Sequence, residues 1–103
     1  MAEGLQHATI TVCGIEIEIA GAADDRYFQQ CAADRVLFEP AVAVAALTLP
    51  EDAVVVDCGA SIGMVSSAVG RRFPDARIIA FEASPAVFPS TKATFKHNGV
   101  FPR

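Results

Sequence analysis

Apolar and polar side chains alternate in the first part of the chain. Between residues 8 and 20, isoleucines and valines occupy every second position on either side of Cys13-Gly14, with Glu16 and Glu18 among them. This period of two is typical of half-buried strands, and Gly14 can supply the positive φ of a two-residue turn. We therefore predict a β-hairpin over residues 8–20, whose apolar face covers the sheet of the domain.

Residues 24–48 are predicted to be a helical lead-in. An acid of the Asp24-Asp25 pair can cap a short helix that reaches Cys31 or beyond. Glu39-Pro40 then opens a second helix that runs to about Leu47, because proline suits the first helical turn.

Residues 53–100 combine strand and helix periods in the order of a nucleotide-binding βαβ unit. The run Val54-Val55-Val56 ends in Asp57, and the run of residues 78–81 ends in Glu82. A run of β-branched valines is too short for a helix and fits a strand buried on both faces, as in a parallel sheet. Glu82 then lies at the carboxyl end of its strand, where a carboxylate can accept both hydroxyl protons of a ribose.

The segment between the two strands is predicted to be a turn followed by a helix over residues 64–73. Gly59 and Gly63 lie in the turn, where a Cβ would clash with a ligand or with the neighbouring strand. Apolar residues at helical spacing give the helix one face toward the sheet, namely Ile62, Val65, Val69 and Phe73.

A further helix is predicted after the second strand. Ser84 can cap it, Pro85 suits its first position, and Asn98-Gly99 can end it with a left-handed glycine. Pro89 conflicts with this start because it lacks an N–H, so the helix either begins near Phe88 or has a distorted first turn. Two aromatic residues spaced two turns apart are expected to face the core: Phe88 and Phe95.

The spacing of the turn glycines separates two classes of ligand. A dinucleotide loop, G-x-G-x-x-G, would need glycine at positions 59, 61 and 64, but the last two are serine and methionine. An acid-x-G-x-G-x-G loop would need an acid at 57 and glycines at 59, 61 and 63, and only Ser61 departs from it. The second loop resembles that of S-adenosylmethionine-dependent methyltransferases. Their cofactor carries an ammonium and a sulfonium, which the carboxylate of Asp57 would suit.

Several segments together resemble the FkbM-type methyltransferases. That family typically reads D-x-G-A-N-I-G, then F-P-x-A-x-V, then F-E-P-x-P. The matching stretches stand in the same order and spacing here, at residues 57–63 (DCGASIG), 73–77 (FPDAR) and 81–85 (FEASP). Phe38-Glu39-Pro40 and Asn98-Gly99 also fit, so the resemblance covers roughly residues 36–100. The departures from the family pattern are Ser61 for an asparagine, Ala83 for a proline and Pro89 for a helix former.

The resemblance implies S-adenosylmethionine as cofactor and methyl transfer to a hydroxyl oxygen of a small molecule, often a sugar or natural product. Glu39 either approaches the methionine end of the cofactor or is only an acid at a helix start. No residue can be named as the catalytic base. Cofactor binding is expected from the glycine loop and the end of the second strand, through Asp57, Gly59, Ala60, Ser61, Gly63, Glu82 and Ala83.

The implied fold class is α/β, a Rossmann-like class I methyltransferase fold truncated after the second βα unit and preceded by the hairpin and short helices. With 103 residues the chain is at most one domain, which we expect to be a partial methyltransferase domain over residues 1–103. The family's sheet normally has further strands, whose loops hold the adenine and the acceptor. We therefore expect the chain by itself to bind the cofactor weakly or not at all and to transfer no methyl group.

Composition narrows the class of partner. A net charge of -4, with no basic cluster larger than Arg71-Arg72, argues against nucleic acid. No apolar stretch is long enough to span a bilayer and no signal pattern opens the chain, so the cytoplasm is the default location. The 3 cysteines are scattered, and neither a disulfide framework nor a zinc site follows from them. His7 and His97 are interpreted as surface residues, and no metal is expected.

Alternative functions stay open at this stage. The glycine turn also fits α/β structure that binds no ligand, or another nucleotide-binding Rossmann-like protein. A non-catalytic chain that acts as an interaction module is a function of a different class. A reading frame that continues past Arg103 into a third strand ending in an acid would favour the enzyme.

Overall fold

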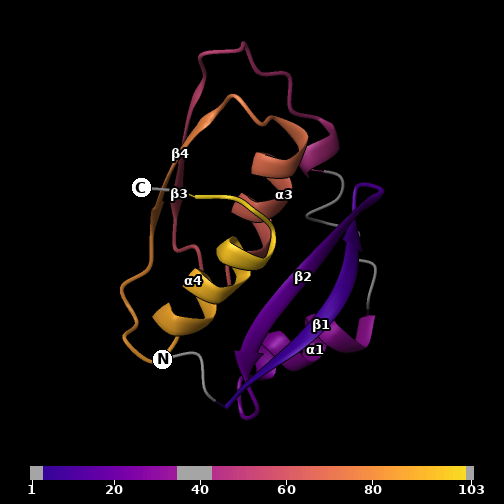
Figure 1. Cartoon of the computed structure of the whole chain (residues 1–103), viewed down its shortest axis with the longest axis vertical. Coiled ribbons are helices and arrows are strands. Elements are labelled where there is room, and N and C mark those ends of the chain that lie inside the picture. Colours follow the sequence, from indigo (N-terminus) through magenta and orange to yellow (C-terminus); the bar gives the residue numbers. More distant parts are fainter. Residues whose placement is uncertain (1–3, 35–42, 102–103) are drawn as a thin grey trace.

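The structure, a computed structural model, describes residues 4–34 and 43–101 as two small sheets with helices between and beside them. The antiparallel hairpin consists of β1 (Leu5–Val12) and β2 (Ile15–Ala22), and the parallel sheet of β3 (Val54–Cys58) and β4 (Arg77–Phe81). Helices α3 (Met64–Arg72) and α4 (Phe88–His97) lie between the two sheets, and α1 (Arg26–Asp34) packs against the hairpin (Figure 1). The order β3-α3-β4-α4 is the predicted βαβ unit with its following helix.

The helical lead-in is described only in part. Asp25 caps α1, because its Oδ1 accepts a hydrogen bond from the N–H of Phe28 at 3.1 Å. The start of the second predicted helix, with Glu39-Pro40, lies outside the described residues, whereas residues 43–45 are helical. Within the two described ranges, no helix has the length and apolar character needed to cross a membrane.

The hairpin predicted over residues 8–20 is present and extends further at both ends. Cys13 and Gly14 form its turn with φ angles of 54° and 74°, and Val12 pairs with Ile15 across it. Two consecutive positive φ angles are the geometry that suits the twist of a two-residue hairpin. The hairpin does not cover the parallel sheet as expected, because β2 packs against α3 and α4 instead.

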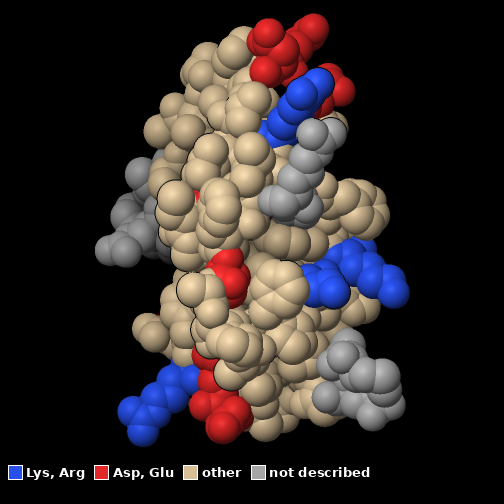
Figure 2. Space-filling model, turned by 90° about the vertical axis from the view of Figure 1, so that its left-hand side faces the viewer, with Lys and Arg blue, Asp and Glu red and all other residues tan. Residues whose placement is uncertain are grey.

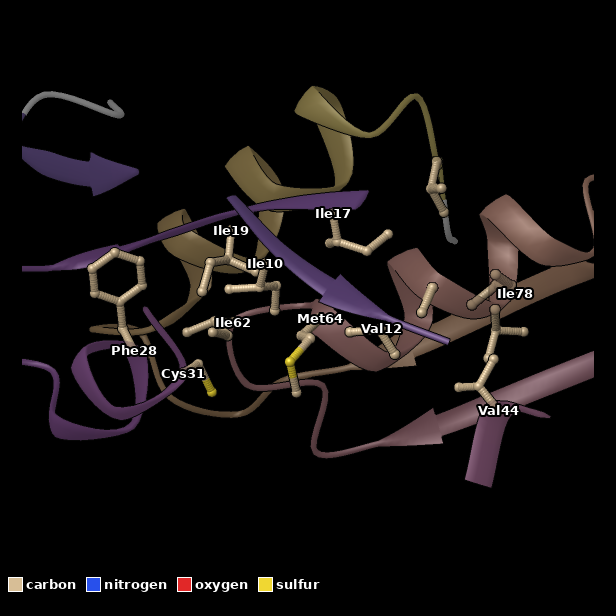
Figure 3. Close-up of a cluster of buried hydrophobic side chains, with 13 residues drawn as sticks. Ile10, Val12, Ile17, Ile19, Phe28, Cys31, Val44, Ile62, Met64 and Ile78 are labelled. Atoms are coloured by element: carbon tan, nitrogen blue, oxygen red, sulfur yellow. The ribbon is translucent and has the colours of Figure 1, made fainter. Parts of the chain in front are cut away.

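One hydrophobic core joins the hairpin to the helices (Figure 3). The hairpin contributes four side chains that are at most 1% exposed, namely Ile10, Val12, Ile17 and Ile19. They meet residues at the start of α3 and on α1, among them Ile62, Met64, Phe28 and Cys31. Full burial of such a side chain favours folding by about 1.5–3 kcal/mol, so this contact holds the two halves of the fold together.

Side chains of α4 occupy the outer edge of β2. The amide of Asn98 accepts a hydrogen bond from the N–H of Glu18 at 3.0 Å and donates one to its C=O at 2.8 Å. One turn earlier, the hydroxyl of Thr94 accepts a hydrogen bond from the N–H of Ala20 at 2.9 Å. These side chains take the place of a neighbouring strand, and an open sheet edge is thereby closed.

An Asn98→Ala variant is expected to lose about 1–3 kcal/mol of folding stability, because the N–H and C=O of Glu18 would be left part-buried and unpaired. Urea unfolding of the whole encoded protein measures this. Gln30→Ala, at an exposed position of α1, is the matched control and should stay within about 0.5 kcal/mol of the parent. Equal unfolding midpoints for the two variants would contradict the role assigned to Asn98.

The parallel sheet is apolar on both faces but buried on only one. Val55 pairs with Ile78 on the inner face, where Ile78 is 6% exposed. On the outer face Val54, Val56 and Phe81 are 58%, 55% and 58% exposed. Figure 2 looks onto this side, where most of the surface carries no charge. The prediction of a strand buried on both faces is therefore wrong for this structure, since no element of the described chain covers the outer face.

Helix α3 is buried over a wider arc than the single face predicted for it. Ile62 and Val69 are buried as expected, but Val65 is 39% exposed. Met64 and Ala68, which the prediction left out, are buried instead. The reason is that α3 packs against β2 as well as β4, so its buried side is set by two neighbours rather than by the sheet alone.

Helix α4 begins at Phe88, the first of the two alternatives. Pro89 then lies in the first turn, where no intrahelical donor is needed. The predictions for Ser84 and Pro85 are wrong, because residues 85–87 form a separate turn and α4 has no side-chain cap. Phe88, the first residue of the helix, is 47% exposed rather than core-facing.

The carboxyl end of α4 agrees with the prediction. Gly99 has a φ of 66°, and its N–H donates to the C=O of Lys96 at 3.2 Å. The N–H of Val100 donates to the C=O of Phe95 at 3.0 Å. These paired hydrogen bonds satisfy carbonyls that the end of a helix leaves free.

Candidate functional site

The loop after β3 and the end of β4 meet at one edge of the parallel sheet. Both strands run in the same direction, so their carboxyl ends lie together. The N–H groups of Gly59 and Ala60 both donate to the C=O of Phe81, at 2.9 and 2.8 Å. These hydrogen bonds hold the first half of the loop against the end of β4, next to Glu82.

The loop contains a left-handed residue at every second position. The φ angles of Gly59, Ser61 and Gly63 are 81°, 52° and 82°. The three positions are those of the acid-x-G-x-G-x-G spacing, so the geometry accounts for the pattern even where serine replaces glycine. A non-glycine residue is uncommon at positive φ, and its presence at Ser61 indicates that the surrounding contacts hold the loop in this shape.

The two glycines are needed for different reasons. A Cβ built on Gly59 would have no atom within 4 Å, so among the described residues only the positive φ disfavours a side chain at this position. A Cβ on Gly63 would lie 2.8 Å from Cε1 of Phe95 and 3.1 Å from the C=O of Thr91. The close neighbour of Gly63 within the described chain is therefore α4, and not the neighbouring strand that was one of the two predicted reasons for the glycine.

Glu82 ties the loop to the start of the segment that follows β4. Its Oε1 accepts a hydrogen bond from the N–H of Ser61 at 2.7 Å, and its Oε2 accepts one from the N–H of Ser84 at 2.9 Å. A carboxylate offers about four lone-pair sites, so each oxygen keeps capacity for another donor. Glu82 is half-buried and Ala83 beside it is exposed. The carboxylate is thus fixed in place and still reachable.

Asp57 is held by the first turn of α3. Its Oδ2 accepts a hydrogen bond from the hydroxyl of Ser66 at 2.5 Å, and Ser66 itself is 1% exposed. Thr91 of α4 fixes the loop from the other side by donating its hydroxyl proton to the C=O of Ser61. The structure therefore brings together Asp57, the glycine loop and Glu82, as predicted. Glu39 lies outside the described residues.

A hollow of about 230 Å³ opens between the loop and α4. Its lining is mainly apolar, with one carboxylate and one ammonium group, from Ala60, Ala80, Glu82, Phe88, Thr91, Lys92 and Phe95. Small-molecule sites usually enclose about 300–1,000 Å³. The hollow is smaller than that range, so the described residues do not enclose a complete small-molecule pocket at this place.

Two titratable groups on α1 have raised pKa values away from the loop. Burial raises the pKa of the Tyr27 hydroxyl, and the neighbouring Cys31 adds to the effect. Burial likewise raises the pKa of the Cys31 thiol. Cys31 is 3% exposed in the core, which makes it a packing residue with its proton retained at neutral pH.

A cluster that the sequence did not predict lies on the face of the hairpin that points away from the core. His7 and His97 are exposed, as expected, but their ring centroids are only 4.7 Å apart. Nδ1 of His7 lies 3.8 Å from Oε1 of Glu18. The sequence holds no signature for this cluster because its members are brought together by the docking of α4 on β2.

The chain is similar to transferases in sequence and in fold. No family model matches it. Over 49 residues, 48% of the chain, it is 41% identical to a protein named Methyltransferase 1 from Beauveria bassiana (strain ARSEF 2860), of which the match covers 18%. The matched part of the chain therefore spans about a fifth of the length of this curated relative.

Among solved structures, the fold is similar to the crystal structure of a protein from Pyrococcus horikoshii described as a "putative transferase". The TM-score is 0.58 at 21% sequence identity, and the match covers 95% of this chain and 33% of that chain. At this identity the likeness concerns the fold alone. Because the match covers 95% of the chain, it includes the hairpin as well as the parallel sheet.

Proposed function

We propose that this chain is the cofactor-binding part of an S-adenosylmethionine-dependent methyltransferase of FkbM type. The observation that carries the proposal is the alternation of left-handed residues at 59, 61 and 63, placed between Asp57 and Glu82. Similarity to a protein named Methyltransferase 1 supports the same class of enzyme. The proposed acceptor is a hydroxyl group of a small molecule, such as a sugar or natural product, rather than nucleic acid or a membrane.

Each loop residue has a proposed role that follows from its chemistry. Asp57, fixed by Ser66, offers a carboxylate to the cationic methionine end of the cofactor. Gly59 keeps the space above the loop free of side chains. Glu82 offers its remaining lone pairs to the ribose hydroxyls. Ala60, Ser61, Gly63 and Ala83 complete the binding surface through the backbone, and Glu39 is a further candidate for the methionine end.

The bound cofactor would supply an electrophilic methyl group, and the chain would supply its position. Methyl transfer needs the acceptor oxygen in line at near-contact distance, so a rigid loop contributes by orientation. A general base takes the hydroxyl proton in most such reactions, and no residue of the described chain is assigned that role. The proposed contribution of residues 57–83 is therefore binding and orientation.

The test is a calorimetric titration of S-adenosylmethionine into the whole encoded protein, with NAD⁺ titrated in parallel. We expect saturable binding of S-adenosylmethionine and none of NAD⁺, since the loop lacks the dinucleotide spacing. Binding of NAD⁺ alone would favour another Rossmann-like function. Binding of neither compound would contradict the proposal.

A Glu82→Ala variant is expected to bind S-adenosylmethionine about 5–150-fold more weakly, which corresponds to about 1–3 kcal/mol for lost charge-assisted hydrogen bonds. The same titration measures the dissociation constant, and circular dichroism checks that the variant is folded. Glu51→Ala, an exposed acid before β3, serves as the control and should leave affinity unchanged. If folded Glu82→Ala protein binds S-adenosylmethionine with the parent's affinity, Glu82 does not belong to the binding site.

A further inference from the structure

Three side chains with metal-binding groups meet on the outer face of the hairpin. His7 lies on β1, Glu18 on β2, and His97 is the last residue of α4. Their ligand atoms all lie within 4.8 Å of one another. The two imidazole rings are edge to face, with planes at 85°. None of these residues belongs to the glycine loop, so the cluster is separate from the proposed cofactor site.

The backbone fixes the cluster's geometry. Thr9 pairs with Glu18 across the hairpin, and His7 lies two residues from Thr9, so His7 and Glu18 share a face. Asn98 holds both backbone groups of Glu18, and His97 precedes it directly. The three positions are therefore tied together by strand pairing on one side and by side-chain hydrogen bonds on the other.

We propose that His7, Glu18 and His97 form a binding site for a divalent transition-metal ion such as Zn²⁺. Imidazole nitrogen and carboxylate oxygen are ligands that zinc takes in proteins, with three protein ligands in sites that keep a fourth position open. With metal–ligand bonds of about 2.0–2.1 Å, neighbouring ligand atoms of a tetrahedral site lie about 3.3 Å apart. The 3.8 Å between His7 and Glu18 is close to this value.

The surroundings suit a bound cation. An open hollow of about 240 Å³ adjoins Glu18 and His97 and has room for water in the remaining coordination position. The cluster lies at the carboxyl end of α4, where the helix dipole favours positive charge. The guanidinium of Arg71 also lines the hollow and by its charge opposes a cation there, but it donates a hydrogen bond to the C=O of Glu16 at 3.1 Å, and Glu16 adds an exposed carboxylate beside the hollow.

A bound ion would tie β1, β2 and α4 together. An ion that binds only the folded state raises stability in proportion to the logarithm of its concentration above the dissociation constant. A bound ion would therefore strengthen the docking of the hairpin on α4 beyond what Asn98 and Thr94 provide. This effect is independent of methyl transfer.

The experiment titrates ZnCl₂ into the metal-free whole encoded protein and follows thermal unfolding, calorimetric heat and the imidazole C–H signals of His7 and His97. We expect one equivalent of zinc to bind, to raise the unfolding temperature and to shift both imidazole signals. His7→Asn, His97→Asn and Glu18→Gln should each weaken binding by at least about tenfold, since loss of even an outer-shell partner costs about 10–100-fold. Glu51→Gln, at an exposed acid before β3 and away from the cluster, is the matched control and should bind like the parent.

Measurements on the unsubstituted protein are enough to overturn the proposal. If the imidazole signals of His7 and His97 do not respond to zinc, the proposal is wrong, whatever the variants show. Equal zinc binding by the parent and by folded His97→Asn protein would also overturn it, because the ion would then lie elsewhere. If the parent protein binds S-adenosylmethionine but not zinc, the proposed metal site is wrong while the proposed function is unaffected.

Discussion

A Gly63→Val variant is expected to lose about 2–5 kcal/mol of folding stability. Two terms add: a β-branched residue at a φ of 82° costs about 1–2 kcal/mol, and overpacking costs about 1–3 kcal/mol. The second term arises because the new side chain would enter the space of Phe95 and the C=O of Thr91. Since whole domains are stable by only about 5–15 kcal/mol, this loss is a large share of the total, and the unfolding temperature and the urea midpoint should both fall clearly.

The matched control is Gly14→Val. Gly14 also has a positive φ, 74°, but a Cβ there would have no atom within 4 Å. The Gly14→Val substitution therefore has the backbone cost without the clash, and should lower the folding stability by about 1–2 kcal/mol. Thermal and urea unfolding compare the two variants. If Gly63→Val is no less stable than Gly14→Val, then packing against α4 is not what requires glycine in the loop.

A Gly59→Val variant is expected to lose S-adenosylmethionine binding while it stays folded. A Cβ at Gly59 faces open space, so folding should cost only the backbone term of about 1–2 kcal/mol. Under the proposed function this space is where the cofactor passes over the loop. A side chain there should weaken binding by about 100-fold or more, roughly 3 kcal/mol.

Calorimetric titration and thermal unfolding of the same Gly59→Val sample separate the two effects. Gly59→Ala adds a smaller side chain and should give an intermediate loss of affinity at a similar stability. The opposite pattern, with a collapsed unfolding transition and unchanged binding by the remaining folded protein, would show that Gly59 has a structural role only.

Local patterns were enough to predict the elements that carry the site. The period-two hairpin, the strand ends at Asp57 and Glu82, and the left-handed end of α4 at Gly99 all follow from residues close together in sequence. The acid-x-G-x-G-x-G spacing also marked the three loop positions, 59, 61 and 63, that have a positive φ in the structure, although the sequence treated Ser61 only as a departure from the pattern. Such features depend on backbone preferences that each short segment expresses by itself.

Features set by packing between distant elements could not be predicted in this way. Val65 and Phe88 were assigned to the core from helical spacing, but spacing does not tell which neighbours a helix has. The hairpin was placed on the sheet, because nothing in the sequence links Glu18 to Asn98 before α4 is known to lie on β2. The cluster of His7 and His97 depends on the same docking, and so it was missed.

The hydrogen bonds between Asn98 and Glu18 join residues that are 80 positions apart. During synthesis the hairpin leaves the ribosome before the helix that closes its edge. Contacts of such long sequence separation slow folding, because the chain between them must be ordered before they form. The outer edge of β2 therefore stays unpaired until the end of α4 is made. A nascent chain stopped before Asn98 should accordingly be a preferred target for chaperones that bind exposed apolar strands.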